Sequence, residues 1–168
     1  MDSPTRNAIR VPFLMIGFMA LAAVFSLGVI GSMVKASAQP ETYRTVTGTG
    51  IGTITVNSVT EENINIDFSA ATDASGEKIV DGTFTMTRLN GEVIGSGTVE
   101  SGELGDDDLQ LKGTLGANGI LGVNGGKAFK ITSKIGADVP VKFDTRLPGG
   151  GCRGSFTATV SPMDAEPT

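Results

Sequence analysis

The composition of this 168-residue chain excludes several classes of function before any motif is considered. Histidine is missing, and with it the usual general base, the usual zinc ligand and every Ser–His or Cys–His catalytic pair. Acidic residues outnumber basic residues by 18 to 13, the net charge is −5, and the sequence shows no basic cluster. Because a phosphate backbone is bound by clustered positive charge, we expect no nucleic-acid partner.

The apolar run at residues 11–34 contains no charged residue and is predicted to form a hydrophobic helix. It exceeds the about 7–15 residues of a signal-peptide core and reaches the about 20 that span a bilayer. Ala36 and Ala38 nevertheless form a small-x-small cleavage site. Residues 1–38 are therefore either a signal peptide that is cleaved near Ala38 or a permanent signal-anchor.

Arg6 and Arg10 decide the direction of this segment in the membrane. Because positive charges stay on the cytoplasmic side, the N-terminus is predicted to lie inside and residues 39–168 outside the cytoplasm. If the leader is not cleaved, the chain is tethered to the membrane through residues 11–34. If it is cleaved, the rest is secreted.

Polar and apolar residues alternate strictly in several segments that follow a short linker at residues 39–42. In Ile64–Ala70 every even-numbered residue is apolar, and Phe156–Val160 shows the same pattern. Because successive side chains of a strand point to opposite faces, each segment is expected to bury one face. We predict about nine short strands, at 43–49, 52–58, 62–70, 79–89, 92–101, 107–115, 127–135, 139–146 and 154–161.

Turn signals separate these segments, and the strongest is Asn90-Gly91, which predicts a hairpin with a type I′ turn. Hairpins of this length and spacing favour a single all-β domain at residues 43–161. It is predicted to be an antiparallel sandwich or an up-and-down barrel of about 8–9 strands. Residues 162–168 are expected to form a flexible tail.

Cys152 is the only cysteine, so the fold is not held by a disulfide within the chain. Outside the cytoplasm such a residue is either an intermolecular thiol or a small buried or loop residue. Without a histidine beside it, Cys152 is a poor candidate for a catalytic nucleophile.

Calcium is the one metal that carboxylates without histidine or cysteine would suit, and no other cofactor is expected. Asp106, Asp107 and Asp108 are its candidate ligands, in a predicted turn. The spacing departs from that of an EF-hand loop, which alternates its ligands and ends on a distal glutamate. The alternative is a solvated turn whose charges keep the strand edge from pairing with neighbours.

A pair of carboxylates would also suit glycoside hydrolysis, for which Asp67, Asp144 and the three aspartates at 106–108 are candidates. Sugar sites usually present aromatic platforms, yet the chain has no tryptophan and one tyrosine. A carboxylate-based hydrolase is therefore disfavoured.

These patterns favour an exported, non-catalytic β-domain that serves as an interaction or structural module of the cell envelope or of the secreted space. The alternative is a small apolar-ligand binder with a lipocalin-like barrel, whose cavity would be lined by residues such as Ile66, Phe68, Phe84 and Met86. This resemblance to lipocalins is architectural only, because the tryptophan expected near the first strand is missing. The partner is then a protein or a small molecule that the sequence does not name.

Overall fold

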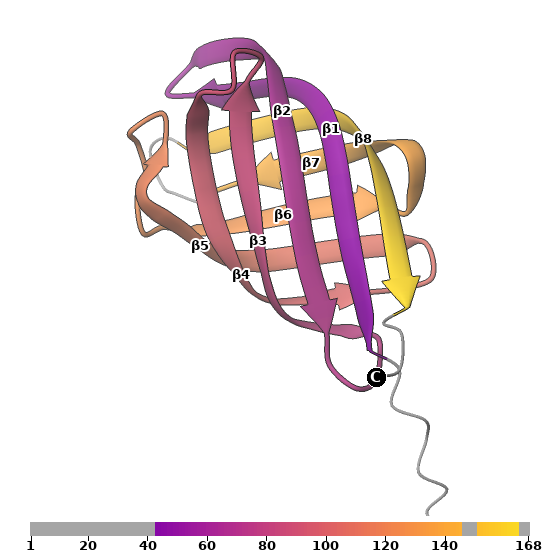
Figure 1. Cartoon of the computed structure of the whole chain (residues 1–168). Coiled ribbons are helices and arrows are strands. Elements are labelled where there is room, and N and C mark those ends of the chain that lie inside the picture. Colours follow the sequence, from indigo (N-terminus) through magenta and orange to yellow (C-terminus); the bar gives the residue numbers. More distant parts are fainter. Residues whose placement is uncertain (1–42, 146–150, 165–168) are drawn as a thin grey trace, which may run out of the picture. The chain divides into compact units, whose positions relative to one another are not determined.

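The computed structural model describes residues 43–145 and 151–164, which form a closed barrel of eight antiparallel β-strands (Figure 1). Each strand pairs with the next along the chain, and the last pairs with the first, so the barrel has no free edge. The strands are β1 (Arg44–Val56), β2 (Val59–Thr72), β3 (Lys78–Arg88), β4 (Val93–Leu104), β5 (Asp108–Ile120), β6 (Ala128–Lys134), β7 (Gly136–Asp144) and β8 (Cys152–Asp164). Of the two predicted architectures, the up-and-down barrel is confirmed.

The hydrophobic helix predicted at residues 11–34 and the linker at 39–42 lie outside the described residues. Within the described part of the chain, no helix is long and apolar enough to cross a membrane. The end of the barrel where β1 begins is also the end where β8 finishes (Figure 1).

Several strands are longer than the sequence predicted, and β1 and β8 show why. The segments 43–49 and 52–58 were expected as separate strands, but they form the single strand β1, with a register shift between Gly52 and Thr53. The glycines do not break the strand because Gly50 and Gly52 face inward and pair with residues of β8. Strand β8 continues past residue 161 to Asp164, where it still pairs with the start of β1.

The predicted hairpin at Asn90-Gly91 is present, but its turn is of another type. Only Gly91 has a positive φ, of 84°, and its N–H donates to the carbonyl of Arg88 at 2.9 Å. This is a three-residue loop with a glycine in the left-handed region, not a type I′ turn. Two successive positive φ values, of 49° and 67°, occur instead at Asn57 and Ser58, which join β1 to β2.

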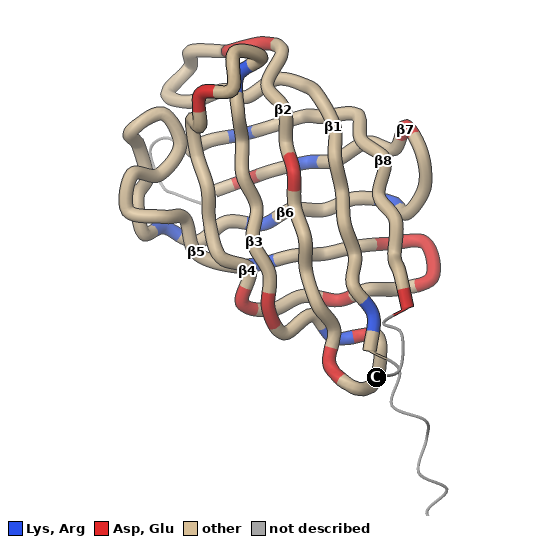
Figure 2. The backbone as a smooth tube through the Cα atoms, in the orientation of Figure 1, with Lys and Arg blue, Asp and Glu red and all other residues tan. Residues whose placement is uncertain are grey.

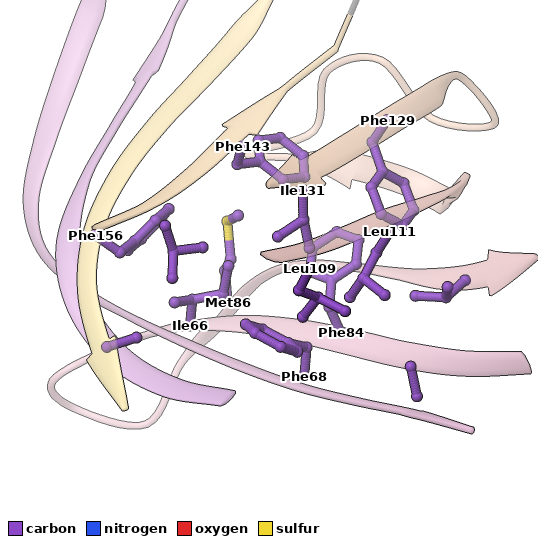
Figure 3. Packing of buried hydrophobic residues seen from close by; sticks show 14 of the residues in the cluster. Ile66, Phe68, Phe84, Met86, Leu109, Leu111, Phe129, Ile131, Phe143 and Phe156 are labelled. Carbon is purple, nitrogen blue, oxygen red and sulfur yellow. The ribbon is translucent and has the colours of Figure 1, made fainter. Parts of the chain in front are cut away.

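The alternation of the sequence gives the barrel an apolar interior. Phe84, Phe129 and Phe143 lie together at its centre, with ring centroids 4.6, 5.4 and 5.8 Å apart (Figure 3). They come from β3, β6 and β7, and each ring is at most 3% exposed. Contacts between the three rings therefore connect β3 with β6 and β7 across the interior.

Every phenylalanine of the barrel lies beside a glycine on a neighbouring strand. The pairs are Phe68 with Gly48, Phe84 with Gly97, Phe129 with Gly113, Phe143 with Gly154 and Phe156 with Gly52. A glycine has no side chain of its own at this point, so the ring can cover its backbone. Large and small residues thus alternate around the interior and fill it.

Gly97 provides a test of this arrangement. A Cβ atom at this position would lie 2.5 Å from the ring of Phe84, 2.8 Å from the carbonyl oxygen of Thr114 and 3.0 Å from the ring of Phe129. We expect Gly97→Ala to lower the free energy of unfolding by about 1–3 kcal/mol, as overpacking of a core does. The measurement is guanidinium unfolding of the full chain in a nonionic detergent.

The control is Gly105→Ala in the exposed turn between β4 and β5, where a new Cβ meets its nearest atom at an ordinary 3.6 Å. This variant is expected to be neutral or slightly stabilising, because alanine restricts the unfolded chain. Equal stability of the two variants would contradict the packing described for the interior.

Candidate functional site

Strand pairing brings together basic residues that lie far apart in the sequence. Lys112 on β5 lies opposite Lys130 on β6, Lys130 lies opposite Asp144 on β7, and Asp144 lies opposite Arg153 on β8. Lys142 precedes Asp144 by two positions and therefore points to the same outer face. We call these five residues the basic surface; Figure 2 shows the distribution of charge over the barrel. The sequence has no run of basic residues, yet the fold gathers the four cations of this surface on one outer face. The absence of a nucleic-acid partner stays a prediction.

The cations of the basic surface form no ion pair with any residue that the structure describes. Among the described residues, no carboxylate lies within 4.0 Å of the charged groups of Lys112, Lys130, Lys142 or Arg153. Lys112 and Lys130 lie directly opposite each other on neighbouring strands. The Cβ atoms of residues in such positions are about 4.5–5.5 Å apart. Like charges in this position oppose folding, so the fold itself does not account for them.

Three other cations of the barrel, Arg44, Arg88 and Lys134, are paired with carboxylates, whereas Lys78 and Lys127 form no ion pair with a described residue. Arg88 donates to Glu61 at 2.7 and 3.0 Å and to Glu92 at 2.7 Å. These hydrogen bonds hold the pKa of Glu61 below its ordinary value and raise that of Arg88. Arg44 lies 3.2 Å from Asp164. The basic surface therefore gathers on one face four of the six described cations that make no ion pair with a described residue.

A shallow groove of about 350 Å³ crosses the basic surface. Its polar lining consists of Lys130, Lys142, Arg153, the carboxylate of Asp144 and the hydroxyl residues Thr132 and Ser155. Positive charges, hydroxyl groups and one hydrogen-bond acceptor are thus concentrated in one place. Phe143 is the large apolar residue among those that line this groove, and its ring is buried.

The three predicted calcium ligands lie elsewhere, in the turn between β4 and β5. This turn belongs to the end of the barrel where β1 begins and β8 finishes, and Figure 2 shows acidic residues gathered there. Asp108 forms an ion pair with Lys134 at 2.5 Å, and the carbonyl of Asp107 accepts a hydrogen bond from Ile135. Across the described ranges, no three histidine, cysteine, aspartate or glutamate side chains gather closely enough to hold a metal ion. A calcium site at Asp106–Asp108 stays a prediction.

A groove of about 900 Å³ opens at this acidic end. Its charged lining residues are Arg44, Glu77, Lys78, Glu103, Asp106, Asp108 and Asp164. Two of these carboxylates are already paired with cations, Asp108 with Lys134 and Asp164 with Arg44.

The carboxylates considered for hydrolysis are not brought into one cleft. Asp67 lies on the outer face of β2, where the hydroxyl of Thr49 donates to it. Asp144 lies on β7, and β1 and β8 separate these two strands in the barrel. The remaining candidates, Asp106–Asp108, belong to the turn between β4 and β5.

Cys152 lies inside the barrel with no exposed area. Its N–H donates to the hydroxyl of Thr145 at 2.7 Å, and the side-chain amide of Asn124 donates to its sulfur at 3.2 Å. Burial raises the pKa of the thiol, while the hydrogen bond from Asn124 acts in the opposite direction. This burial favours the alternative of a small buried residue, and the intermolecular thiol stays a prediction that requires opening of the barrel.

Comparison of the chain with known protein families, curated proteins and solved structures gave no match. The candidate site therefore stands on the geometry of this molecule alone.

Cys152 also allows a test of its burial. We expect the native full chain to react with a water-soluble disulfide reagent at least about 100-fold more slowly than the chain unfolded in guanidinium, because reaction requires opening of the barrel. The matched control is Cys152→Ala combined with Ser155→Cys, which moves the thiol to the exposed face of the same strand. Fast native labelling, or a disulfide-linked dimer on a non-reducing gel, would restore the intermolecular thiol.

The same thiol predicts a dependence of stability on alkaline pH. Its pKa is higher in the folded chain than the about 8.5 of a free cysteine, so folding favours the protonated form. The contribution to the free energy of unfolding is fully present below about pH 8.5 and is lost as the pH rises through the raised folded value. The measurement is the free energy of unfolding of the wild type and of Cys152→Ala as a function of pH. The difference between the two curves isolates the thiol from other titrating groups.

Proposed function

We propose that this protein is an exported, non-catalytic β-barrel that acts through its outer surface, as an interaction or structural module of the cell envelope or of the secreted space. The observation that carries the proposal is the filled interior combined with an outer face of unpaired cations. Because the interior is occupied by side chains, the surface is the part of the barrel that remains for recognition.

The packing of the barrel favours this proposal over the binding of an apolar ligand inside. The residues expected to line such a cavity, Ile66, Phe68, Phe84 and Met86, are at most 4% exposed and belong to one cluster of buried side chains (Figure 3). Ligand-binding barrels instead keep an apolar space of about 300–1,000 Å³. The missing histidine and the separated carboxylates are what support a non-catalytic role.

The volume of the interior can be tested at Met86, which is fully buried. In a filled barrel, Met86→Trp is expected to lower the free energy of unfolding by about 1–3 kcal/mol, because a well-packed core does not accept a larger side chain. The volume-conserving control, Met86→Leu, is expected to change it by less than about 1.5 kcal/mol. If tryptophan is accommodated without loss in guanidinium unfolding, the barrel has room for a ligand and the alternative function gains support.

Export is tested with the Cys152→Ala/Ser155→Cys chain expressed in intact bacterial cells. A membrane-impermeant maleimide added to spheroplasts is expected to label Cys at position 155, because the barrel is predicted to lie outside the cytoplasm. The control is the same chain without residues 11–34, which should be labelled only after lysis. Labelling of both chains only after lysis would contradict export, and N-terminal sequencing distinguishes cleavage near Ala38 from a retained anchor.

A further inference from the structure

We propose that the basic surface binds a polysaccharide that carries carboxylate groups, and that Lys112, Lys130, Lys142 and Arg153 hold these carboxylates. The inference rests on the proposed function, because it assigns a partner to an outer surface that acts outside the cell.

The arrangement of the cations fits an extended anionic chain. Lys112, Lys130 and Arg153 follow one line across four neighbouring strands, so the line is about 14 Å long at the usual strand spacing of about 4.8 Å. Lys142 lies beside this line on the same face. Charges that are unpaired and in line can engage several groups of a polymer at once, which adds affinity without deep burial.

The surface lacks the features that anchor a protein partner. Stable protein interfaces depend on buried aromatic or aliphatic side chains at their centre. Within the described residues, none of the exposed large apolar side chains lies on β5, β6 or β7. The closed barrel also offers no strand edge to which an extended peptide could add. Recognition here depends on charge and hydrogen bonds alone.

Asp144 favours a sugar over a polymer that is only anionic. A carboxylate in the middle of the cations repels every anion, and it becomes useful when the ligand also has hydrogen-bond donors. Asp144 makes no ion pair with a described residue, and it shares the groove with the hydroxyl residues Thr132 and Ser155. Sugar rings carry hydroxyl donors next to their carboxylates. They can therefore contact both the cations and the carboxylate of Asp144.

A second copy of this chain is the main competing occupant, because the acidic end of one barrel is complementary in sign to the basic surface of another. Two of the carboxylates at that end, Asp108 and Asp164, are already paired with cations of their own barrel. This pairing favours an external polymer.

The first test measures the affinity of the full chain, in a nonionic detergent, for immobilised polygalacturonate, with neutral dextran as the uncharged control. Binding to polygalacturonate is expected to weaken with salt and to fall about tenfold or more in Lys130→Gln/Lys142→Gln. The matched control, Lys78→Gln/Lys127→Gln, removes the same charge at exposed positions outside the basic surface and is expected to retain the affinity.

The second test uses Asp144→Asn and compares polygalacturonate with polyacrylate, which carries carboxylates but no hydrogen-bond donors. Loss of the repulsion from Asp144 affects both polymers and cancels in the ratio of their affinities. Loss of the charged acceptor affects the sugar alone, so the preference for polygalacturonate is expected to fall several-fold. A role of Asp144 in structure only would leave this ratio unchanged.

Four results would overturn the proposal. The first is no binding of polygalacturonate at low salt, and the second is equal loss in both pairs of lysine variants. The third is tighter binding of poly-L-glutamate than of polygalacturonate, which would assign the surface to an acidic protein. The fourth is a dimer that Lys130→Gln/Lys142→Gln abolishes, which would assign the surface to a second copy. Each of these leaves the labelling of position 155 in spheroplasts unaffected, so failure of this inference is distinguishable from failure of export.

Discussion

The contact between each buried phenylalanine and a glycine on the neighbouring strand determines what this barrel can be. An eight-stranded barrel has an interior just wide enough for side chains to fill. Five rings occupy it, and each lies against a residue without a side chain, as Phe84 does against Gly97 and Phe68 against Gly48. Because the volume is shared in this way, an addition at a glycine produces a clash and a truncation of a ring produces a void. The interior therefore serves the stability of the fold, which is why we propose that recognition takes place at the outer surface.

Alternating hydrophobicity was sufficient to predict the all-β class and the inward residues, because this pattern is local. Ile64–Ala70 and Phe156–Val160 each bury their apolar residues as expected. The number of strands was less accurate, since the glycines at 50 and 52 resemble a break when the sequence is considered alone. Their partners, Ala158 and Phe156, lie about a hundred residues further along the chain, and only the closure of β8 onto β1 explains why the strand continues. The type of the turn at Asn90-Gly91 was likewise decided by the way the hairpin fits the barrel.

The basic surface could not be predicted from the sequence because no window of the chain contains it. Its members are spread over four successive strands, from Lys112 on β5 to Arg153 on β8, and they meet only once strand order and register are known. The register itself is fixed by the core, since Gly113 must meet Phe129 and Leu111 must meet Ile131 on the inner face. Lys112 and Lys130 each lie between two of these inward residues on their own strand. The two lysines must therefore face each other on the outer face. A shift of the register between β5 and β6 by one residue would turn the core side chains to solvent. The packing of the interior therefore determines that these two lysines lie opposite each other.

A single substitution would remove the repulsion between Lys112 and Lys130 at little cost to the fold. This is why we assign the proposed function to the basic surface. Substitution of an exposed lysine usually changes the free energy of unfolding by no more than about 0.5 kcal/mol, and here it would relieve a repulsion. The fold therefore does not need Lys112, Lys130, Lys142 or Arg153 to be basic, and a carboxylate at one of the first two positions would suit it better. Residues that oppose the stability of the fold without a compensating gain are expected at functional sites. For this barrel, that criterion points to the outer face of β5 to β8 and away from the interior.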